Sequence, residues 1–139
     1  MRQLQMNRRG VLGALIVWFS AVAVSANAQN FPGEYADRKF LNGRAVFQMS
    51  LEQSGNALSV WFSAGYNDGH GCSVDAQGTG KTAGKGAVEF TFRDSSNNSG
   101  TGTLTRAGED LAVALKLTHA GDARCQELYR QNIRLKRTK

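Results

Sequence analysis

The chain has 139 residues and a formal net charge of +6, and 41% of its residues are hydrophobic. A chain of this length normally makes one domain with a single core. Its positive charge is not a sign of nucleic-acid binding, because three of the arginines fall in an N-terminal segment that we expect to be removed. The rest of the excess is local, with five basic and no acidic residues from Arg130 to Lys139. We therefore expect no nucleic-acid partner.

Residues 1–28 predict a cleavable secretory signal peptide. Basic residues precede an apolar run over 11–24, and Ala26-Asn27-Ala28 forms a small-residue cleavage site. The apolar run is shorter than the roughly 20 residues that a membrane-spanning helix needs. We therefore expect an exported protein, periplasmic or secreted, with no transmembrane span after cleavage. The Sec route is the first expectation, and the Arg8-Arg9 pair leaves the twin-arginine route as an alternative.

Cleavage leaves a single domain over residues 29–139, with a net charge of +3 from 14 basic and 11 acidic residues. Its two cysteines, Cys72 and Cys125, are predicted to form a disulfide, because thiols oxidise outside the cytoplasm. The alternative is a metal site in which His70 and His119 join the two cysteines, but these spacings match no common zinc pattern. We therefore expect no metal site and no cofactor.

Hydrophobic and polar residues alternate through most of the domain, as in half-buried β-strands, and helical periodicity hardly appears. The clearest hairpin joins residues 47–52 to 58–63 through a turn at Ser54-Gly55-Asn56. In the last strand, Gln131 is expected to share the inner face with Tyr129, Ile133 and Leu135. The other expected strands begin near Gly33 or cover the Gly-rich stretch 73–86, residues 88–93, 101–105 and 111–117.

About eight consecutive strands with short connections predict an all-β fold, an antiparallel meander. Closing the meander into a small barrel removes the exposed edges that would otherwise promote aggregation. A two-sheet sandwich is the alternative. No repeat or second-domain boundary is visible, and we expect a monomer.

The polar segment from Gly65 to Cys72 is the candidate binding loop. Its glycines permit tight or left-handed backbone, which would expose Tyr66, Asn67, Asp68 and His70 on a rigid rim. The structural alternative is an ordinary long turn, since Asn, Asp and Gly are what such a turn needs. Asp68 and His70 could act as a catalytic pair only beside a nucleophile, and an oxidised Cys72 supplies none. We therefore assign no catalytic residue.

A second Gly-rich segment, Gly78-Thr79-Gly80-Lys81-Thr82, ends like a phosphate-binding P-loop. Asp75 stands where that motif needs its first glycine, and an all-β chain lacks the strand-loop-helix context. Nucleotide binding is therefore excluded, and these glycines are expected to serve strand twist and turns.

Two surface features are candidate contacts. Trp61 lies between the core residues Val60 and Phe62, so strict alternation places its ring on the polar face of its strand, either exposed or under a loop. The basic residues Arg134, Lys136 and Arg137 give the last strand a positive edge, which discourages edge-to-edge pairing and could attract an anionic surface or an acidic protein.

The segment from Ala64 to Cys72, the glycines after it, Gly102-Thr103-Leu104 and Cys125 before Tyr129 resemble small exported bacterial proteins of uncharacterised function. The layout is also similar to that of the periplasmic lysozyme inhibitors, small disulfide-linked β-barrels that insert a loop into the active site of the enzyme. This resemblance implies a small β-barrel fold and a location outside the cytoplasm. No inhibitory motif can be matched residue by residue.

Three function classes follow from these features. The first is a non-catalytic binding module of the bacterial envelope with an envelope or host protein as its partner, in its most specific form an inhibitor of a lysozyme-like enzyme. The second is a small-ligand carrier of lipocalin-like type, which requires a hollow interior. The third is an enzyme that uses the loop of Asp68 and His70.

Overall fold

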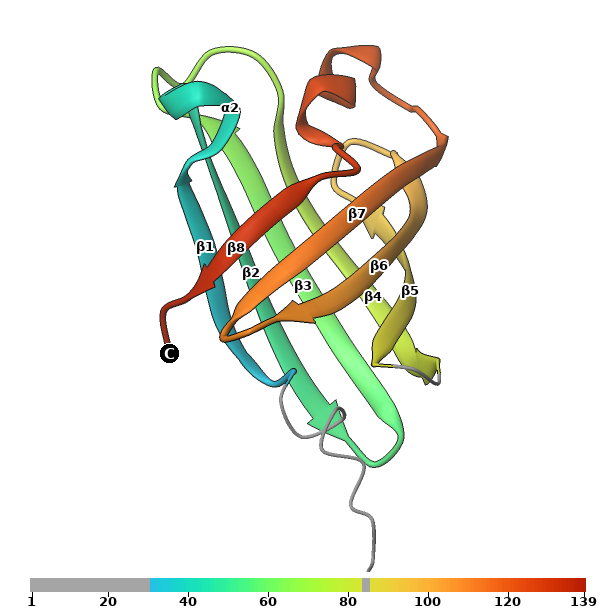
Figure 1. The fold of residues 1–139 in the computed structure, drawn as a ribbon. Helices are drawn as coiled ribbons and strands as arrows, with labels where there is room; N and C mark the ends of the chain where they lie inside the picture. Colours follow the sequence, from blue (N-terminus) through green and yellow to red (C-terminus); the bar gives the residue numbers. More distant parts are fainter. Residues whose placement is uncertain (1–30, 84–85) are drawn as a thin grey trace, which may run out of the picture.

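A computed structural model describes residues 31–83 and 86–139; the predicted signal peptide lies outside these residues. Eight antiparallel strands form a closed barrel in which each strand pairs with the next and β8 returns to β1 (Figure 1). The predicted all-β meander and its closure are therefore confirmed, and the sandwich alternative is wrong. The strands are β1 (Gly33–Lys39), β2 (Ala45–Ser54), β3 (Ala57–Tyr66), β4 (Ser73–Ala83), β5 (Ala87–Asp94), β6 (Ser99–Ala107), β7 (Asp110–His119) and β8 (Ile133–Arg137).

A short pairing between the first and last strands closes the barrel. Tyr35 and Ala36 of β1 face Arg137 and Lys136 of β8 in antiparallel register. The Arg137 guanidinium lies 5.1 Å from the centre of the Tyr35 ring and donates to its hydroxyl at 2.8 Å. Because β8 also pairs with β7, it is not a sheet edge. Edge protection, the reason suggested by the sequence for its basic residues, is therefore wrong.

Two short helical segments interrupt the strands, and neither was predicted. The first, α2 (Phe40–Gly43), is a turn in which Leu41 and Asn42 have left-handed backbone, with φ of 54° and 58°. The second, the 3-10 helix η1 (Ala123–Leu128), lies between β7 and β8. Since β8 begins only at Ile133, Gln131 falls in the preceding loop and is exposed, so its predicted inward orientation is wrong. Among the described residues, no helix is long and apolar enough to cross a membrane.

In the wall formed by β4, β5 and β6, each of two phenylalanines on β5 lies between glycines on the neighbouring strands. Phe92 of β5 faces Gly78 and Gly100 on its two neighbours, and Phe90 faces Gly80 and Gly102. A Cβ on Gly102 would overlap the Phe90 ring. The missing side chains therefore let the rings lie against the neighbouring backbone, an arrangement known to stabilise glycines in sheets. The P-loop-like segment is accordingly part of strand β4.

Aromatic rings occupy the barrel interior toward the end that carries η1. Phe47 stacks on Phe62, with ring centres 5.5 Å apart, and Phe62 meets Phe92 edge to face at 5.2 Å. Tyr129 then stacks on Phe92 at 5.3 Å with an angle of 6° between the rings. The opposite half is packed with buried aliphatic side chains, among them Leu51, Leu58, Val60, Leu104, Leu111 and Leu135.

Candidate functional site

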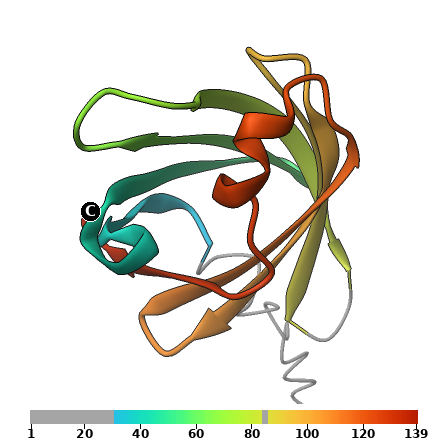
Figure 2. The same ribbon diagram turned by 90° about the horizontal axis from the view of Figure 1, so that it is seen from above.

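Four connections gather at one end of the barrel, and η1 lies over its opening (Figure 2). They are the turn α2, the β3–β4 loop, the β5–β6 loop and the long β7–β8 connection that contains η1. The β3–β4 loop, drawn in green, projects away from the barrel, whereas η1 is drawn over the opening. The predicted binding loop therefore projects from this end of the barrel.

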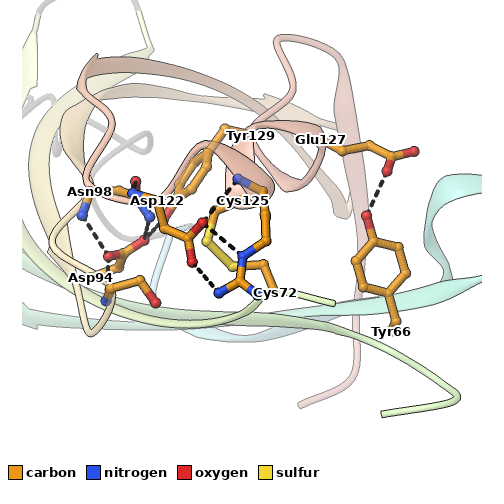
Figure 3. Close-up of a disulfide and its surroundings, with 10 residues drawn as sticks. Tyr66, Cys72, Asp94, Asn98, Asp122, Cys125, Glu127 and Tyr129 are labelled. Atoms are coloured by element: carbon orange, nitrogen blue, oxygen red, sulfur yellow. Dashed lines mark hydrogen bonds and ion pairs between the residues drawn. A yellow bond between two sulfur atoms is a disulfide. The ribbon is translucent and has the colours of Figure 1, made fainter. Parts of the chain in front are cut away.

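A disulfide between Cys72 and Cys125 joins the base of the β3–β4 loop to η1 (Figure 3). Both cysteines are buried, and the bond confirms the predicted pairing. The alternative metal site is wrong, because the two sulfurs are bonded to each other and are not available as thiolate ligands. Asp122 is the third metal-ligating side chain close to the sulfurs, whereas neither histidine belongs to this group in the described parts of the chain.

A buried carboxylate, that of Asp94, holds the β5–β6 loop against the β7–β8 connection (Figure 3). It accepts hydrogen bonds from the backbone amides of Ser96 and Asn98, at 2.8 and 2.9 Å, and from the Asn98 side chain at 2.8 Å. The Tyr129 hydroxyl donates a further, very short bond. The fully buried Asn98 in turn accepts from the backbone of Asp122 at 3.1 Å.

Burial by itself raises the pKa of Asp94, but its hydrogen bonds from Tyr129, Asn98 and Ser96 outweigh that effect and leave the pKa below its usual value. Burial of the ring, and then the contact with Asp94, raise the pKa of Tyr129 well above its normal value. The group is thus an ionised carboxylate beside a neutral phenol at neutral pH. With its oxygens fully engaged, Asp94 supports the loops and does not face solvent as a reactive group.

A second polar cluster anchors the base of the β3–β4 loop. The Tyr66 hydroxyl donates to Glu127 of η1 at 2.6 Å, and Arg44, directly after α2, donates to the other oxygen of that carboxylate at 2.6 Å. These hydrogen bonds, from Tyr66 first and then Arg44, lower the pKa of Glu127. Asn67 donates through its side chain to the Gly43 carbonyl at 2.8 Å. Three separate connections are therefore tied together around one carboxylate.

The tip of the same loop is open to solvent. The side chains of Asp68 and His70 are 68% and 90% exposed, and His70 Nδ1 lies 3.7 Å from a carboxylate oxygen of Asp68. Gly69 and Gly71 supply the left-handed backbone of the turn, with φ of 73° and 83°. The Asp68 carboxylate also accepts from the His70 backbone at 2.9 Å, a short-range bond that shapes the turn. The arrangement presents the two side chains outward but sets no nucleophilic thiol beside them.

The other predicted contact residues lie away from this loop. Trp61 is on the outer face of β3 and 37% exposed, so its outward orientation is as predicted. Arg134 and Lys136 are exposed on β8, and Arg134 lies 3.5 Å from Asp110. Arg137 instead contacts Tyr35, as part of the barrel closure. The predicted residues therefore form three separate surfaces.

Sequence reasoning missed the residues that hold the loop end together, namely Arg44, Asp94, Asn98 and Glu127. Asp94 and Asn98 border a run of turn-forming residues, which was the one available signal for a side chain that bonds its own loop. For Glu127 and Arg44 there was no such signal, because 83 residues separate them in the chain.

A scan against protein-family models and a search of curated proteins found no match to this chain.

Proposed function

We propose that this protein is a non-catalytic binding module that is exported from the cytoplasm and recognises a partner protein through the β3–β4 loop. The observation that carries the proposal is the contrast between the two ends of this loop. Its base is fixed by the disulfide and by the Tyr66–Glu127–Arg44 cluster, and its tip exposes Asp68 and His70.

A loop of this kind suits recognition for a physical reason. Binding costs less free energy when the contacting segment is already ordered, because fewer backbone and side-chain rotations are lost. Loops held on a rigid scaffold are accordingly common binding elements. A projecting, anchored loop also suits insertion into a cleft, so an inhibitor of a lysozyme-like enzyme is the most specific form of the proposal.

The general proposal is tested by placing a photo-crosslinking amino acid at position 70 in cells that produce the protein. We expect a discrete crosslinked species that disappears when Tyr66 and Glu127 are replaced by Phe and Gln, because these changes release the base of the loop. The matched control carries the crosslinker at position 109, in the β6–β7 turn at the other end of the barrel. Equal crosslinking from both positions contradicts a role for the loop.

The inhibitor form is tested with purified protein and a lysozyme, by column retention and by the rate of cell-wall lysis. We expect retention and slower lysis, both lost in Asp68→Ala/His70→Ala and both kept in Glu109→Ala. A protein that neither retains nor slows lysozyme removes the inhibitor form. Mass spectrometry of the exported protein tests the compartment, and we expect a chain that begins at Gln29.

A further inference from the structure

A groove crosses the outer wall of the barrel, away from the projecting loop. It extends over β1 to β5, with Trp61 among its lining residues, and has a volume of about 1120 Å³. Trp61 is the one exposed large hydrophobic side chain in the described residues. Sites for small molecules combine an apolar surface with a few polar groups in a concave region, and this groove has both.

The sheet register aligns the side chains of the groove. Glu34, Ser50, Trp61, Gln77 and Arg93 face one another on five consecutive strands. With neighbouring strands about 4.8 Å apart, this row spans roughly 19 Å along the curved wall of the barrel. A planar aromatic ring thus stands at the centre of a line of polar side chains.

The polar side chains of this row are free to bind a ligand. Within the described residues, Gln77, Arg93 and the neighbouring Gln48 make no side-chain hydrogen bond or ion pair, in contrast to Asp94, which also lines the groove but has its oxygens engaged in hydrogen bonds. Planar amides and a guanidinium can each donate two directed hydrogen bonds. The groove therefore offers directional hydrogen bonding on both sides of the indole.

The wall continues as a hydroxyl-rich surface beyond the groove. A second depression shares Gln77 and Arg93 with it, and a third depression shares Thr79, Thr91 and Thr101 with the second. The surface is thus longer than one small molecule and suits a chain-like ligand. Its charged side chains have both signs, Glu34, Asp75 and Asp94 against Arg38, Arg93 and Lys139, so no polyanion is selected.

We infer that this row is a binding site for an extended, uncharged, β-linked oligosaccharide, with one sugar ring stacked on Trp61. The C–H groups on the face of a pyranose ring carry partial positive charge, which the negative face of an indole attracts. Sugar hydroxyls pair well with amides and guanidinium groups. In an extended β-linked chain, successive rings repeat at about the spacing of successive strands, so the rings next to the one on Trp61 can lie over the neighbouring strands of the row.

A protein partner fits this surface less well. Protein interfaces are anchored by several buried aromatic or aliphatic side chains, whereas this face exposes a single one among polar neighbours. The site also lies on the barrel wall, so it does not depend on the function proposed for the loop.

Titration of the full chain with chitotetraose and cellotetraose tests the inference. In a Trp18→Phe background Trp61 is the remaining tryptophan, so its fluorescence reports on the groove alone. We expect a saturable change with at least one of the two sugars. By calorimetry, Trp61→Ala should weaken the binding by about tenfold or more and Trp61→Phe by less, since a ring remains to stack. Gln77→Ala should also weaken it.

Glu109→Ala, in a distant turn, is the control and should bind as the parent chain does. Circular dichroism of each variant checks that the barrel is intact, which we expect because Trp61 and Gln77 are exposed. The inference is overturned if neither sugar gives a signal, or if Trp61→Ala binds unchanged. Loss of protein crosslinking in Trp61→Ala, without any sugar binding, would assign this face to a protein and also overturn it.

Discussion

At the scale of single residues, the glycines that face Phe90 and Phe92 have a steric function. Adding a methyl group at Gly102 forces it into the Phe90 ring, and the ring has little room to move in a packed interior. Overpacking of this kind typically costs about 1–3 kcal/mol. We therefore expect Gly102→Ala to lower the free energy of unfolding by that amount in a urea titration.

Gly65→Ala is the matched control, because it also lies in a strand. The nearest side-chain atom to its added methyl group is the Ser73 hydroxyl oxygen at 3.4 Å, an ordinary contact distance. Its unfolding midpoint should stay close to that of the parent chain. Equal midpoints for the two variants would show that the wall does not depend on the close approach of ring and backbone.

A second prediction at this scale concerns Asp94, because its hydrogen bonds join two loops. Hydrogen bonds to a charged group each contribute about 1.5–3 kcal/mol. Asp94→Asn keeps the shape of the side chain but removes the charge. We expect it to lower the free energy of unfolding at pH 7 by at least the contribution of one such bond. Glu109→Gln on the surface should leave the free energy of unfolding unchanged.

The pH dependence of this effect follows from the lowered pKa of Asp94. A carboxyl that is harder to protonate in the folded chain stabilises the fold above the unfolded pKa near 4. That contribution is lost as the pH falls through the folded pKa. The stability difference between the parent chain and Asp94→Asn should therefore shrink between pH 5 and pH 2 in thermal unfolding. A constant difference would contradict an ionised Asp94.

At the scale of elements, the β3–β4 loop depends on Glu127 more than the barrel does. The carboxylate and the guanidinium of Arg44 are exposed, and exposed ion pairs contribute little to global stability. We expect Glu127→Gln to leave the unfolding midpoint unchanged but to speed hydrogen exchange of the Asn67 amide, which donates to Arg44 in the folded protein. Lowering the pH through the depressed pKa of Glu127 should have the same local effect in the parent chain.

The disulfide is the second feature that acts at the scale of elements. It closes a loop between residues 53 apart, and the chain-entropy model gives about 4 kcal/mol for such a loop. Adding a reductant should therefore lower the urea midpoint markedly. Cys72→Ala/Cys125→Ala should already have the lower midpoint and should not respond to the reductant. An unchanged midpoint on reduction would show that packing alone fixes η1.

At the scale of the whole molecule, the antiparallel strand order followed from the sequence because alternation and short connections leave few arrangements, whereas a two-sheet sandwich remained the alternative to closure. Residues such as Phe47 and Val60 could be assigned to the core from this pattern alone. The β7–β8 connection could not be predicted, since η1 is held by contacts with distant residues and has no periodicity of its own. Gln131 was misplaced for that reason. The loop tip was found from its composition, whereas the groove of Trp61 appeared only once the register was known.

The packed interior makes a prediction about apolar ligands. The rings of Phe47, Phe62, Phe92 and Tyr129 pack against one another in the region in which a carrier would hold its ligand. We expect titration with a fluorescent fatty acid to show no saturable binding, in contrast to a lipocalin measured in parallel. A one-to-one complex with the fatty acid would contradict this expectation and support the carrier alternative.

The pairing of β1 with β8 also decides when the barrel can form. The contact between Tyr35 and Arg137 joins residues 102 apart, so the first strand has no partner on that side until the last strand of the domain is available to pair. Closure is then the last folding event, and a nascent chain that lacks β8 exposes two unpaired strand edges at once. A chain that stalls before residue 133 is therefore expected to be a substrate for chaperones and proteases rather than a smaller, stable barrel.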